Sequence, residues 1–348
     1  MKRLAVIGLG AIGSLVGGYL ARGGEDVTLI SAFQRDQAAH LSRTGLRITG
    51  NGDDFHVPVR AVYLEDLAPE EQFDLVFLGL KSNDLETVIP RFLPHLKADG
   101  CLVSLQNGIN EEYLVSQAGK DRVVAGVTFA GGRLVEPGHM DSHEGFFRVG
   151  ELDGAITPRV LEIADILSQC RPAEATAEIR GWQWDKLARV CLSVPAAAIS
   201  GLYLGQVFME PRLQKLFALL ALELFAVAEA DGSPRQTVEN KTKQDYLDIL
   251  SGKQTGLEGR TDDWPPGIVD AYTSDIQKGR PLEIEFTNGA VVRLGKRYGV
   301  PTPINAFLVD TILAIQAGKE TRGFHQVERV LALAGDQAQS LPDDLIKK

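Results

Sequence analysis

Short runs of apolar residues alternate with polar or glycine-rich segments over the N-terminal part of the chain. Four of these runs are Leu4–Ile7, Val27–Ile30, Phe73–Leu80 and Cys101–Leu105. Runs of this length without polar alternation are typical of strands that are buried on both faces, as in a parallel sheet. The pattern therefore predicts an α/β domain. Shorter strands are expected at Val123–Phe129 and within 138–150, and a helix at Leu85–Leu96 that Pro90 and Pro94 would kink or break.

The first run leads directly into a glycine-rich turn, Gly8-Leu9-Gly10-Ala11-Ile12-Gly13, and then into an apolar helix from Ser14 to Leu20. The glycines have the GxGxxG spacing of dinucleotide-binding strand–turn–helix units. Gly8 permits the tight turn, Gly10 lets the backbone approach a pyrophosphate, and Gly13 lets the helix lie close to the strand. The N–H groups of the helix N-terminus favour such an anion. A purely structural turn is the alternative, because glycines also mark ordinary turns.

The end of the second run bears on the choice of cofactor. An acid there would hold the ribose 2′-OH of NAD, whereas a nearby Arg accommodates the 2′-phosphate of NADP. The chain has Ser31 and Arg35 in this region and no acid between them. We therefore expect NADP(H), with Ser31 and Arg35 among its binding residues. The alternative is that Arg35 is a solvated residue in the first turn of a helix.

Two further polar segments follow buried strands. Lys81 comes after the third run, and Gln106-Asn107-Gly108 comes after the fourth. Ligands of open α/β sheets bind outside the carboxyl ends of the strands, so both segments are candidates for the site. Asn-Gly by itself indicates only a turn.

Helical periodicity replaces the strand pattern from about Glu178 onward. The predicted helices are Trp184–Ile199, Leu213–Ala230, Val291–Tyr298 and Ala306–Ala317. We therefore expect a Rossmann-type dinucleotide-binding domain at residues 1–175, a mostly helical domain at 176–325 and a C-terminal tail at 326–348. The polar stretch 251–266 is predicted to be a surface loop that is able to lie over a cleft.

Composition limits the classes of partner. The chain has 348 residues and a formal net charge of -10, which argues against nucleic acid or an anionic membrane as the main partner. The three cysteines are far apart and have no metal-ligand spacing, so we expect reduced thiols, a cytoplasmic location and no metal. No signal peptide or membrane-spanning run is recognised. The oligomeric state stays open, with a homodimer as one option.

Several phrases together resemble the ketopantoate reductase (2-dehydropantoate 2-reductase) family from Met1 to about Gly318. Besides the glycine-rich turn, Lys81 and Gln106-Asn107-Gly108, they are Val135-Glu136-Pro137-Gly138-His139, Trp184-Asp185-Lys186-Leu187-Ala188, Gly279-Arg280-Pro281-Leu282-Glu283-Ile284-Glu285, Asn288-Gly289 and Gly299-Val300-Pro301-Thr302-Pro303. The resemblance implies a Rossmann domain followed by a helical domain of the 6-phosphogluconate dehydrogenase C-terminal type. It also implies an active site in the cleft between the two domains.

The resemblance further assigns roles to residues. Lys186 is implied to be the catalytic lysine, which protonates the substrate carbonyl oxygen as hydride reaches the carbon, and Glu283 to orient the lysine or the substrate. Asn107 and Lys81 are implied to contact cofactor and substrate. An alkoxide that forms in a dry cleft does require a positioned acid or cation. The alternatives are that Lys186 is a solvated helix residue and that Glu283 pairs with Arg280.

The chain departs from the family at several substrate positions. Val190 and Val194 stand where the family usually carries Asn, on the same helical face as Lys186, and Ala271 stands where it carries Ser. Ala32 replaces the usual Arg at the end of the second strand. We infer a 2-keto acid with a more apolar side chain than ketopantoate, or an altered substrate pose. Ketopantoate itself remains an option if Ser193 or Thr273 supplies polar groups.

Two classes of function therefore compete. The first is NADPH-dependent reduction of a 2-keto acid to a 2-hydroxy acid, and the second is a non-catalytic NADP(H)-binding redox sensor. Retention of Lys186, Asn107 and Glu283 together favours the enzyme. A 6-phosphogluconate-type or 3-hydroxyacid dehydrogenase is a third interpretation, which the phrases around Lys186 and Glu283 disfavour.

Overall fold

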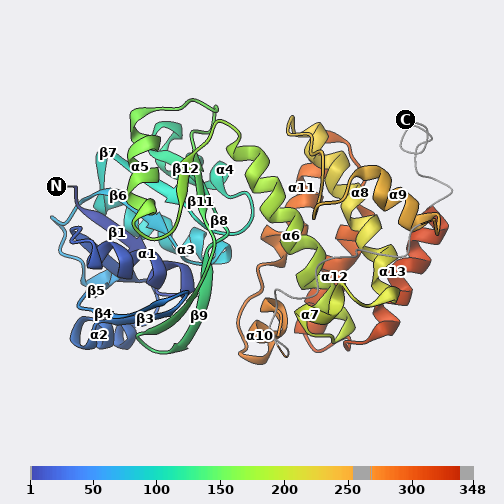
Figure 1. Ribbon diagram of the computed structural model, residues 1–348, viewed down its shortest axis with the longest axis horizontal. Coiled ribbons are helices and arrows are strands. Elements are labelled where there is room, and N and C mark those ends of the chain that lie inside the picture. The colour runs from blue at the N-terminus through green and yellow to red at the C-terminus, as the bar shows by residue number, and fades with distance from the viewer. Residues whose placement is uncertain (1, 254–266, 268, 338–348) are drawn as a thin grey trace. The chain divides into compact units, whose positions relative to one another are not determined.

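The computed structural model describes residues 2–253, 267 and 269–337. The chain forms two compact units, Met1–Gln183 and Trp184–Lys348 (Figure 1). The division differs from the expected one between residues 175 and 176. It falls inside helix α6 (Ile179–Ser200), which begins in the first unit and continues into the second.

Within the described part of the N-terminal unit, a sheet of eight strands has the order β12-β11-β8-β7-β6-β1-β2-β5. The strands are β1 (Leu4–Ile7), β2 (Val27–Ser31), β5 (Arg60–Tyr63), β6 (Phe73–Leu78), β7 (Leu96–Ser104), β8 (Val123–Thr128), β11 (Phe147–Gly150) and β12 (Ala173–Ala175). All neighbours are parallel except β8 and β11. The four apolar runs became β1, β2, β6 and β7, which are adjacent in the sheet, so the predicted α/β class is confirmed.

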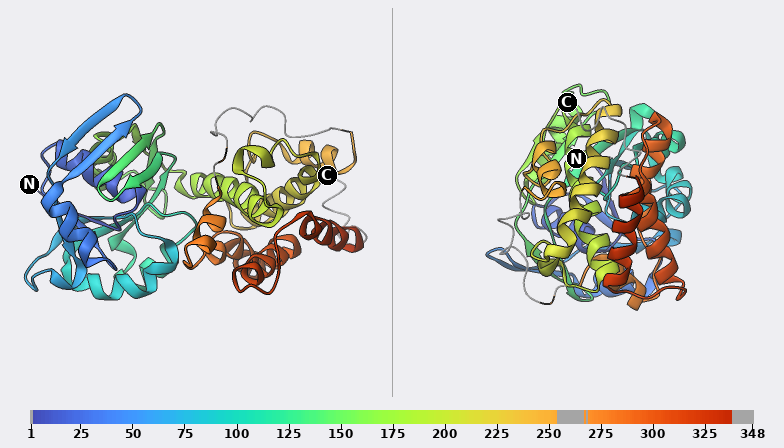
Figure 2. Two further views of the ribbon diagram at one scale, coloured as in Figure 1. Left: turned by 90° about the horizontal axis from the view of Figure 1, so that it is seen from below. Right: turned by 90° about the vertical axis from the view of Figure 1, so that its right-hand side faces the viewer.

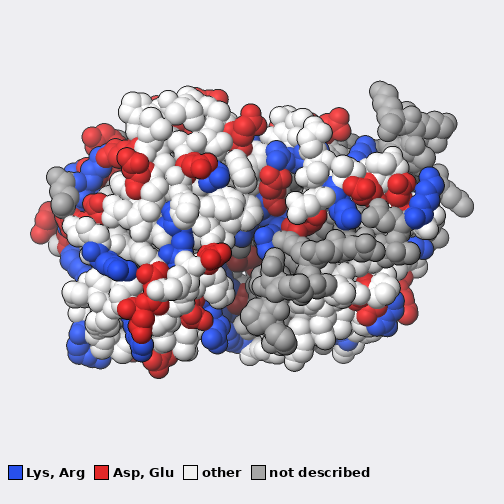
Figure 3. Space-filling view, in the orientation of Figure 1, with Lys and Arg blue, Asp and Glu red and all other residues white. Residues whose placement is uncertain are grey.

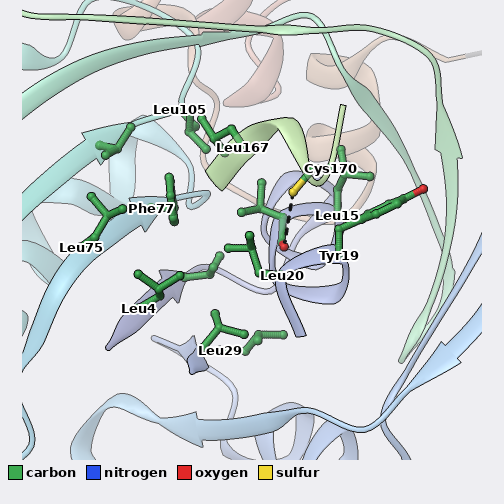
Figure 4. Close-up of a cluster of buried hydrophobic side chains, with 14 of the residues drawn as sticks. Leu4, Leu15, Tyr19, Leu20, Leu29, Leu75, Phe77, Leu105, Leu167 and Cys170 are labelled. Atoms are coloured by element: carbon green, nitrogen blue, oxygen red, sulfur yellow. Dashed lines mark hydrogen bonds between the residues drawn. The ribbon is translucent and has the colours of Figure 1, made fainter. Parts of the chain in front are cut away.

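Alternate residues of each central strand enter two different cores. Leu4 and Val6 belong to the cluster that α1 (Ala11–Arg22) and α5 (Pro158–Ser168) cover, as Figure 4 shows for part of it. Ala5 and Ile7 belong to the cluster on the other face, beneath α3 (Leu85–Phe92) and α4 (Glu111–Ala118). Burial on both faces explains why these strands are apolar throughout. Helix α2 (Arg35–Thr44) packs beside β5 and β2.

A second sheet, of four strands in the described residues, has the order β4-β3-β10-β9. It consists of β3 (Leu46–Gly50), β4 (Asp53–Val57), β9 (Gly131–Glu136) and β10 (His139–His143). The pattern did not predict β3, β4 or β9, because their polar residues face solvent and their apolar positions are few. The stretch 138–150 does contain two strands, β10 and β11, as expected.

The predicted helix Leu85–Leu96 is too long. Helix α3 tolerates Pro90 but ends at Phe92, and a 3₁₀ turn with Pro94 (Leu93–His95) follows. Leu96 is already the first residue of β7. Proline lacks the N–H that a continuing helix needs, so the break comes where Pro94 stands.

The C-terminal unit is helical in its described residues. Its helices, besides α6, are α7 (Leu204–Val207), α8 (Gln214–Ala230), α9 (Lys243–Leu250), α10 (Ala271–Gln277), α11 (Asn288–Tyr298), α12 (Pro303–Gln316) and α13 (Phe324–Gln337). The prediction of a C-terminal tail at 326–348 is wrong for residues 326–337. These residues belong to α13, which packs on α12 and α8 (Figure 2). Residues 338–348, and 254–266 of the predicted surface loop, lie outside the described part.

Surface charge follows no single sign. Acidic and basic side chains are interspersed over the face drawn in Figure 3. Within the part of the chain that the structure describes, none of the helices combines the length and apolar character needed to cross a bilayer.

Candidate functional site

The glycine-rich turn has the geometry that its spacing predicts. Gly8 has a φ of +98°, and a Cβ there would lie 2.6 Å from the Leu80 backbone nitrogen. A Cβ at Gly13 would lie 1.7 Å from the Gly8 carbonyl oxygen, so only glycine lets α1 start this close to β1. At Gly10 the nearest atom to an added Cβ would be the Gly79 carbonyl oxygen at 4.0 Å. The space over Gly10 is therefore open, as close approach of a pyrophosphate requires.

The N-terminus of α1 is available to an anion. Gly10 is its N-cap residue, and no side chain of the described residues caps it. The N–H groups of the first turn, including those of Ala11 and Ile12, have no acceptor within the helix. Gln37 Nε2 donates to the Leu9 carbonyl at 3.1 Å and so links the turn to α2. These features fit the pyrophosphate of a dinucleotide.

Ser31 and Arg35 both lie at the carboxyl end of β2, but they differ in exposure. Ser31 is buried, and its Oγ accepts a hydrogen bond from the Gln34 N–H at 3.2 Å. Arg35, the first residue of α2, is exposed and forms an ion pair with Asp66. Its guanidinium lies 4.6 Å from the ring centroid of Tyr63. Arg35 is thus an exposed residue in the first turn of α2 that pairs with Asp66, and Ala32, three residues earlier, is buried.

Lys81 and Asn107 lie at neighbouring strand ends that are joined by hydrogen bonds. Ser82 Oγ donates to the Asn107 carbonyl at 2.8 Å. Asn110 Nδ2 donates to both the Ser82 Oγ and the Asn107 carbonyl, at 3.0 Å each. Since β6 and β7 are adjacent and parallel, Lys81 and Asn107 belong to the same edge of the sheet as the glycine-rich turn.

A pocket at the opposite edge of this sheet is less suited to the chemistry. It lies before the start of β8 and α5, and its charges are paired as Lys120–Asp153 and Arg159–Glu151. None of the predicted site residues lines it.

Lys186 lies on α6 with Val190 and Val194 at intervals of four residues. All three are half-buried, whereas Leu187, Cys191 and Leu192 behind them are buried. Burial, with a smaller contribution from the charge of Arg189, lowers the pKa of the Lys186 ammonium to about 8. The lysine therefore releases a proton near neutral pH far more readily than a solvated lysine does.

Glu283 is half-buried and immediately precedes a 3₁₀ turn, Ile284–Phe286. Thr287 Oγ1 is hydrogen-bonded to the Tyr272 hydroxyl and donates to the Glu283 carbonyl at 3.3 Å. Burial raises the pKa of Tyr272 well above its ordinary value, and the nearby Cys191 and Glu283 add to the effect. Asn288, five residues after Glu283, donates to the Cys191 carbonyl at 3.1 Å, so this segment lies beside α6.

The remaining predicted substrate residue and the two alternative polar residues differ from Val190 and Val194 in exposure and hydrogen bonding. Ala271 is exposed in the first turn of α10. Ser193, an alternative polar group, is buried and donates to the Arg189 carbonyl at 2.9 Å. Thr273, the other alternative, is buried and bonded to Asp270. Both hydroxyls already have partners within the protein, which weakens them as contacts for a polar substrate.

Within the N-terminal unit, the structure brings the glycine-rich turn, Lys81 and Asn107 to one sheet edge. Sequence reasoning missed Gln37, Tyr63 and Asp66, which support the turn and Arg35. Their roles depend on contacts between separate elements, and their spacing along the chain carries no signal of that. Within the C-terminal unit, it missed the polar residues that link α6 to α8, α11 and α12.

The first unit is thus a Rossmann-type nucleotide-binding domain, and the second is a helical domain. Residues 4–154 match the family described as "Ketopantoate reductase PanE/ApbA", and residues 178–316 match its C-terminal domain. The chain belongs to the ketopantoate reductase family and is therefore an oxidoreductase.

Relatives and solved structures agree with this assignment. The 2-dehydropantoate 2-reductase of Archaeoglobus fulgidus is 27% identical over 332 residues, which cover 91% of this chain and 99% of the relative. A ketopantoate reductase of the PanE/ApbA family from Ralstonia eutropha is 28% identical, with a TM-score of 0.73 over 92% of this chain and 100% of that one. D-mandelate dehydrogenase, solved with NADH and anilino(oxo)acetate, shares the fold at 23% identity and a TM-score of 0.77, over 91% and 99%.

Proposed function

We propose that this protein reduces a 2-keto acid to a 2-hydroxy acid with NADPH. The observation that carries the proposal is the half-buried Lys186, whose pKa is lowered to about 8 on a helix face that it shares with Val190 and Val194. A proton donor is most effective when its pKa lies near the working pH. An ordinary surface lysine would hold its proton too tightly for this role.

NADPH, when bound, supplies the hydride that reduces the carbonyl carbon. The chain's own contribution is the proton: Lys186 Nζ gives it to the carbonyl oxygen, so that a hydroxyl forms instead of an alkoxide. Glu283 orients the lysine or the substrate. Lys81 and Asn107 contact cofactor and substrate at the sheet edge. The N–H groups after Gly10 bind the pyrophosphate.

The cofactor preference rests on the end of β2. No acid follows the strand in 31–35, and Arg35 stands there with its charge at the surface. A guanidinium suits a phosphate better than a ribose hydroxyl, which favours NADPH. The buried Ser31 supports the loop through its bond from the Gln34 N–H, and its role toward the phosphate is part of this proposal.

The substrate preference rests on α6. Val190 and Val194 offer no hydrogen bond on the face that carries Lys186, and Ala271 offers none on α10. Since Ser193 and Thr273 are already bonded within the protein, they do not replace the missing groups. A side chain without hydroxyl groups therefore suits this site better than that of ketopantoate.

The test follows NADPH absorbance with a panel of 2-keto acids at constant enzyme concentration. We expect turnover of at least one member and formation of the matching 2-hydroxy acid in equal amount. NADPH binding without turnover of any panel member would instead indicate the non-catalytic redox sensor. A panel that includes 6-phosphogluconate and 3-hydroxy acids with NADP⁺ tests the third interpretation.

A further inference from the structure

Helix α6 contains a proline, and the carbonyl that this proline leaves unbonded has a side-chain partner. Pro195 has no N–H to donate to the carbonyl of Cys191, four residues earlier. Asn288 Nδ2 donates to that carbonyl at 3.1 Å. Both Cys191 and Asn288 are fully buried, so this bond replaces the missing helical one in a place that water does not reach.

The orientation of the Asn288 amide is fixed by a relay of hydrogen bonds. Asn288 Nδ2 also donates to Asn305 Oδ1 at 2.9 Å, and Asn305 Nδ2 donates to Glu223 Oε2 at 2.6 Å. Glu223 additionally accepts the backbone N–H groups of Ile304 and Asn305, at 2.8 and 3.0 Å. Because Glu223 Oε2 also accepts the Asn305 backbone N–H, this oxygen acts as an acceptor, so Asn305 turns its NH₂ toward Glu223 and its oxygen toward Asn288. Asn288 therefore aims its donor at α6.

The same bond ties together the two segments that carry the proposed catalytic residues. Cys191 lies five residues after Lys186 on α6, and Asn288 lies five residues after Glu283, at the start of α11. Thr287, next to Asn288, is bonded to the Tyr272 hydroxyl of α10 and donates to the Glu283 carbonyl, so the Glu283 segment is itself tied to Asn288.

We propose that Asn288 is a positioning residue for the reaction: through the Cys191 carbonyl it holds α6 at the proline, and so fixes Lys186 relative to the Glu283 segment. The inference rests on the proposed function, in which Lys186 donates the proton. Asn288 touches neither the substrate nor the cofactor in this role. It acts by keeping the surroundings of Lys186 closed, on which the lowered pKa of Lys186 depends.

The test compares wild type, Asn288→Ala, Pro195→Ala and the double variant. Asn288→Ala should lower kcat per folded molecule by roughly 10- to 100-fold, the usual scale for misplacing a catalytic group, with the Kd for NADPH unchanged. The fall in kcat at high pH should move upward from about pH 8, because looser packing hydrates the ammonium. Pro195→Ala restores an N–H for the Cys191 carbonyl, so the cost of Asn288→Ala should shrink in that background.

If Asn288→Ala lowers kcat by the same factor in wild type and in Pro195→Ala, the proposal is overturned. So would an unchanged pH profile combined with a reduced folded fraction, because that is what a purely structural role predicts. If Asn288→Ala does not fold, Asn305→Ala takes its place, since it removes the acceptor that orients the Asn288 amide and should shift the profile in the same direction.

A readout without turnover separates this inference from the proposed function. The rate at which an amine-reactive reagent labels Lys186, followed by mass spectrometry across pH, reports the pKa of Lys186 directly. Wild type that turns over no 2-keto acid would reject the function. A labelling profile that does not move between wild type and Asn288→Ala would reject the positioning role.

Discussion

Arg35 and Asp66 form an ion pair at the carboxyl end of β2, with the guanidinium of Arg35 4.6 Å from the ring centroid of Tyr63. The hydrogen bond to Asp66 raises the pKa of Arg35, so the residue is charged throughout the accessible pH range. The pair is exposed, which makes it weak, and a phosphate can displace or share it at little cost. In the proposed NADPH complex, Asp66 would both support Arg35 and compete with the 2′-phosphate for it.

Arg35→Ala should weaken NADPH binding by roughly 10- to 100-fold, because a charged hydrogen bond to phosphate contributes about 1.5–3 kcal/mol. NADH binding should hardly change. Titration of both cofactors into the apo protein measures the effect. Arg47→Ala is the matched control, since Arg47 also pairs with an exposed acid, Asp54, but lies on β3. Wild type that binds NADH as tightly as NADPH would contradict the cofactor assignment.

Asp66→Asn should change NADPH binding in the opposite direction from Arg35→Ala. It removes a negative charge beside the expected phosphate and frees Arg35, so NADPH binding should tighten by a few-fold, the scale of exposed charge interactions. NADH binding again should stay constant, and Asp54→Asn serves as the control. Weaker NADPH binding in Asp66→Asn would show that Asp66 acts mainly by holding Arg35 in place.

The pH dependence of turnover should report Lys186. Reduction needs the protonated lysine, so kcat for the 2-keto acid should fall as pH rises through about 8. Oxidation of the 2-hydroxy acid needs the neutral lysine and should rise over the same range. Lys186→Met should lower kcat by about 10²–10⁴-fold with NADPH binding nearly intact. Near wild-type turnover in this variant would remove Lys186 from the mechanism.

Glu223 should make the stability of the protein depend on pH. Burial raises the pKa of Glu223 to about 7 from its ordinary 4.5, against the three hydrogen bonds that it accepts. The folded state thus keeps a proton that the unfolded chain releases above pH 4.5. This contribution to the free energy of unfolding is fully present below pH 4.5 and is lost as pH rises through 7.

Glu223→Gln removes this titration. The free energy of unfolding of the variant minus that of wild type should therefore rise between pH 5 and 7 and stay constant above pH 8. Denaturant unfolding at several pH values measures the difference. Glu229→Gln, an exposed position on the same helix, should show no such trend. If wild type instead becomes more stable relative to Glu223→Gln as pH rises, the N–H groups of α12 keep the Glu223 carboxylate ionised.

The sequence predicted the features whose cause is local. The tight turn at Gly8, the open space over Gly10 and the close start of α1 at Gly13 follow from backbone geometry. The central strands follow from burial on both faces. Lys81 and Asn107 were placed at one edge because parallel strands end together. Each of these inferences needs only the residues of a single segment and a general rule of sheet topology.

The features that the sequence did not predict depend on contacts between distant segments. The second sheet pairs β3 with β10, which are far apart in the chain, and polar residues interrupt the apolar pattern of both strands. Helix α13 was taken for a tail, and it is held by packing against α12 and against α8, which is distant in the chain. The relay from Glu223 to Asn305, Asn288 and Cys191 joins four helices, so no local pattern reveals it.

Substrate choice is the most demanding test of the proposed function. Val190 and Val194 are half-buried on the Lys186 face, so each would leave a polar group of the substrate without a partner. Each such loss costs about 1–3 kcal/mol. If both valines line the substrate site as proposed, two losses should lower kcat/KM for ketopantoate on the order of 10²-fold relative to a substrate without hydroxyl groups.

We expect 2-ketoisovalerate or phenylglyoxylate to have a higher kcat/KM than ketopantoate. Val190→Asn combined with Ala271→Ser should move the preference back toward ketopantoate, and Val194→Asn should add to it. Val190→Leu is the matched control, because it changes the size of the side chain but restores no hydrogen bond. A clear preference of wild type for ketopantoate would mean that other residues supply the polar contacts. No movement in Val190→Asn/Ala271→Ser, with normal folding, would show that these positions do not contact the substrate.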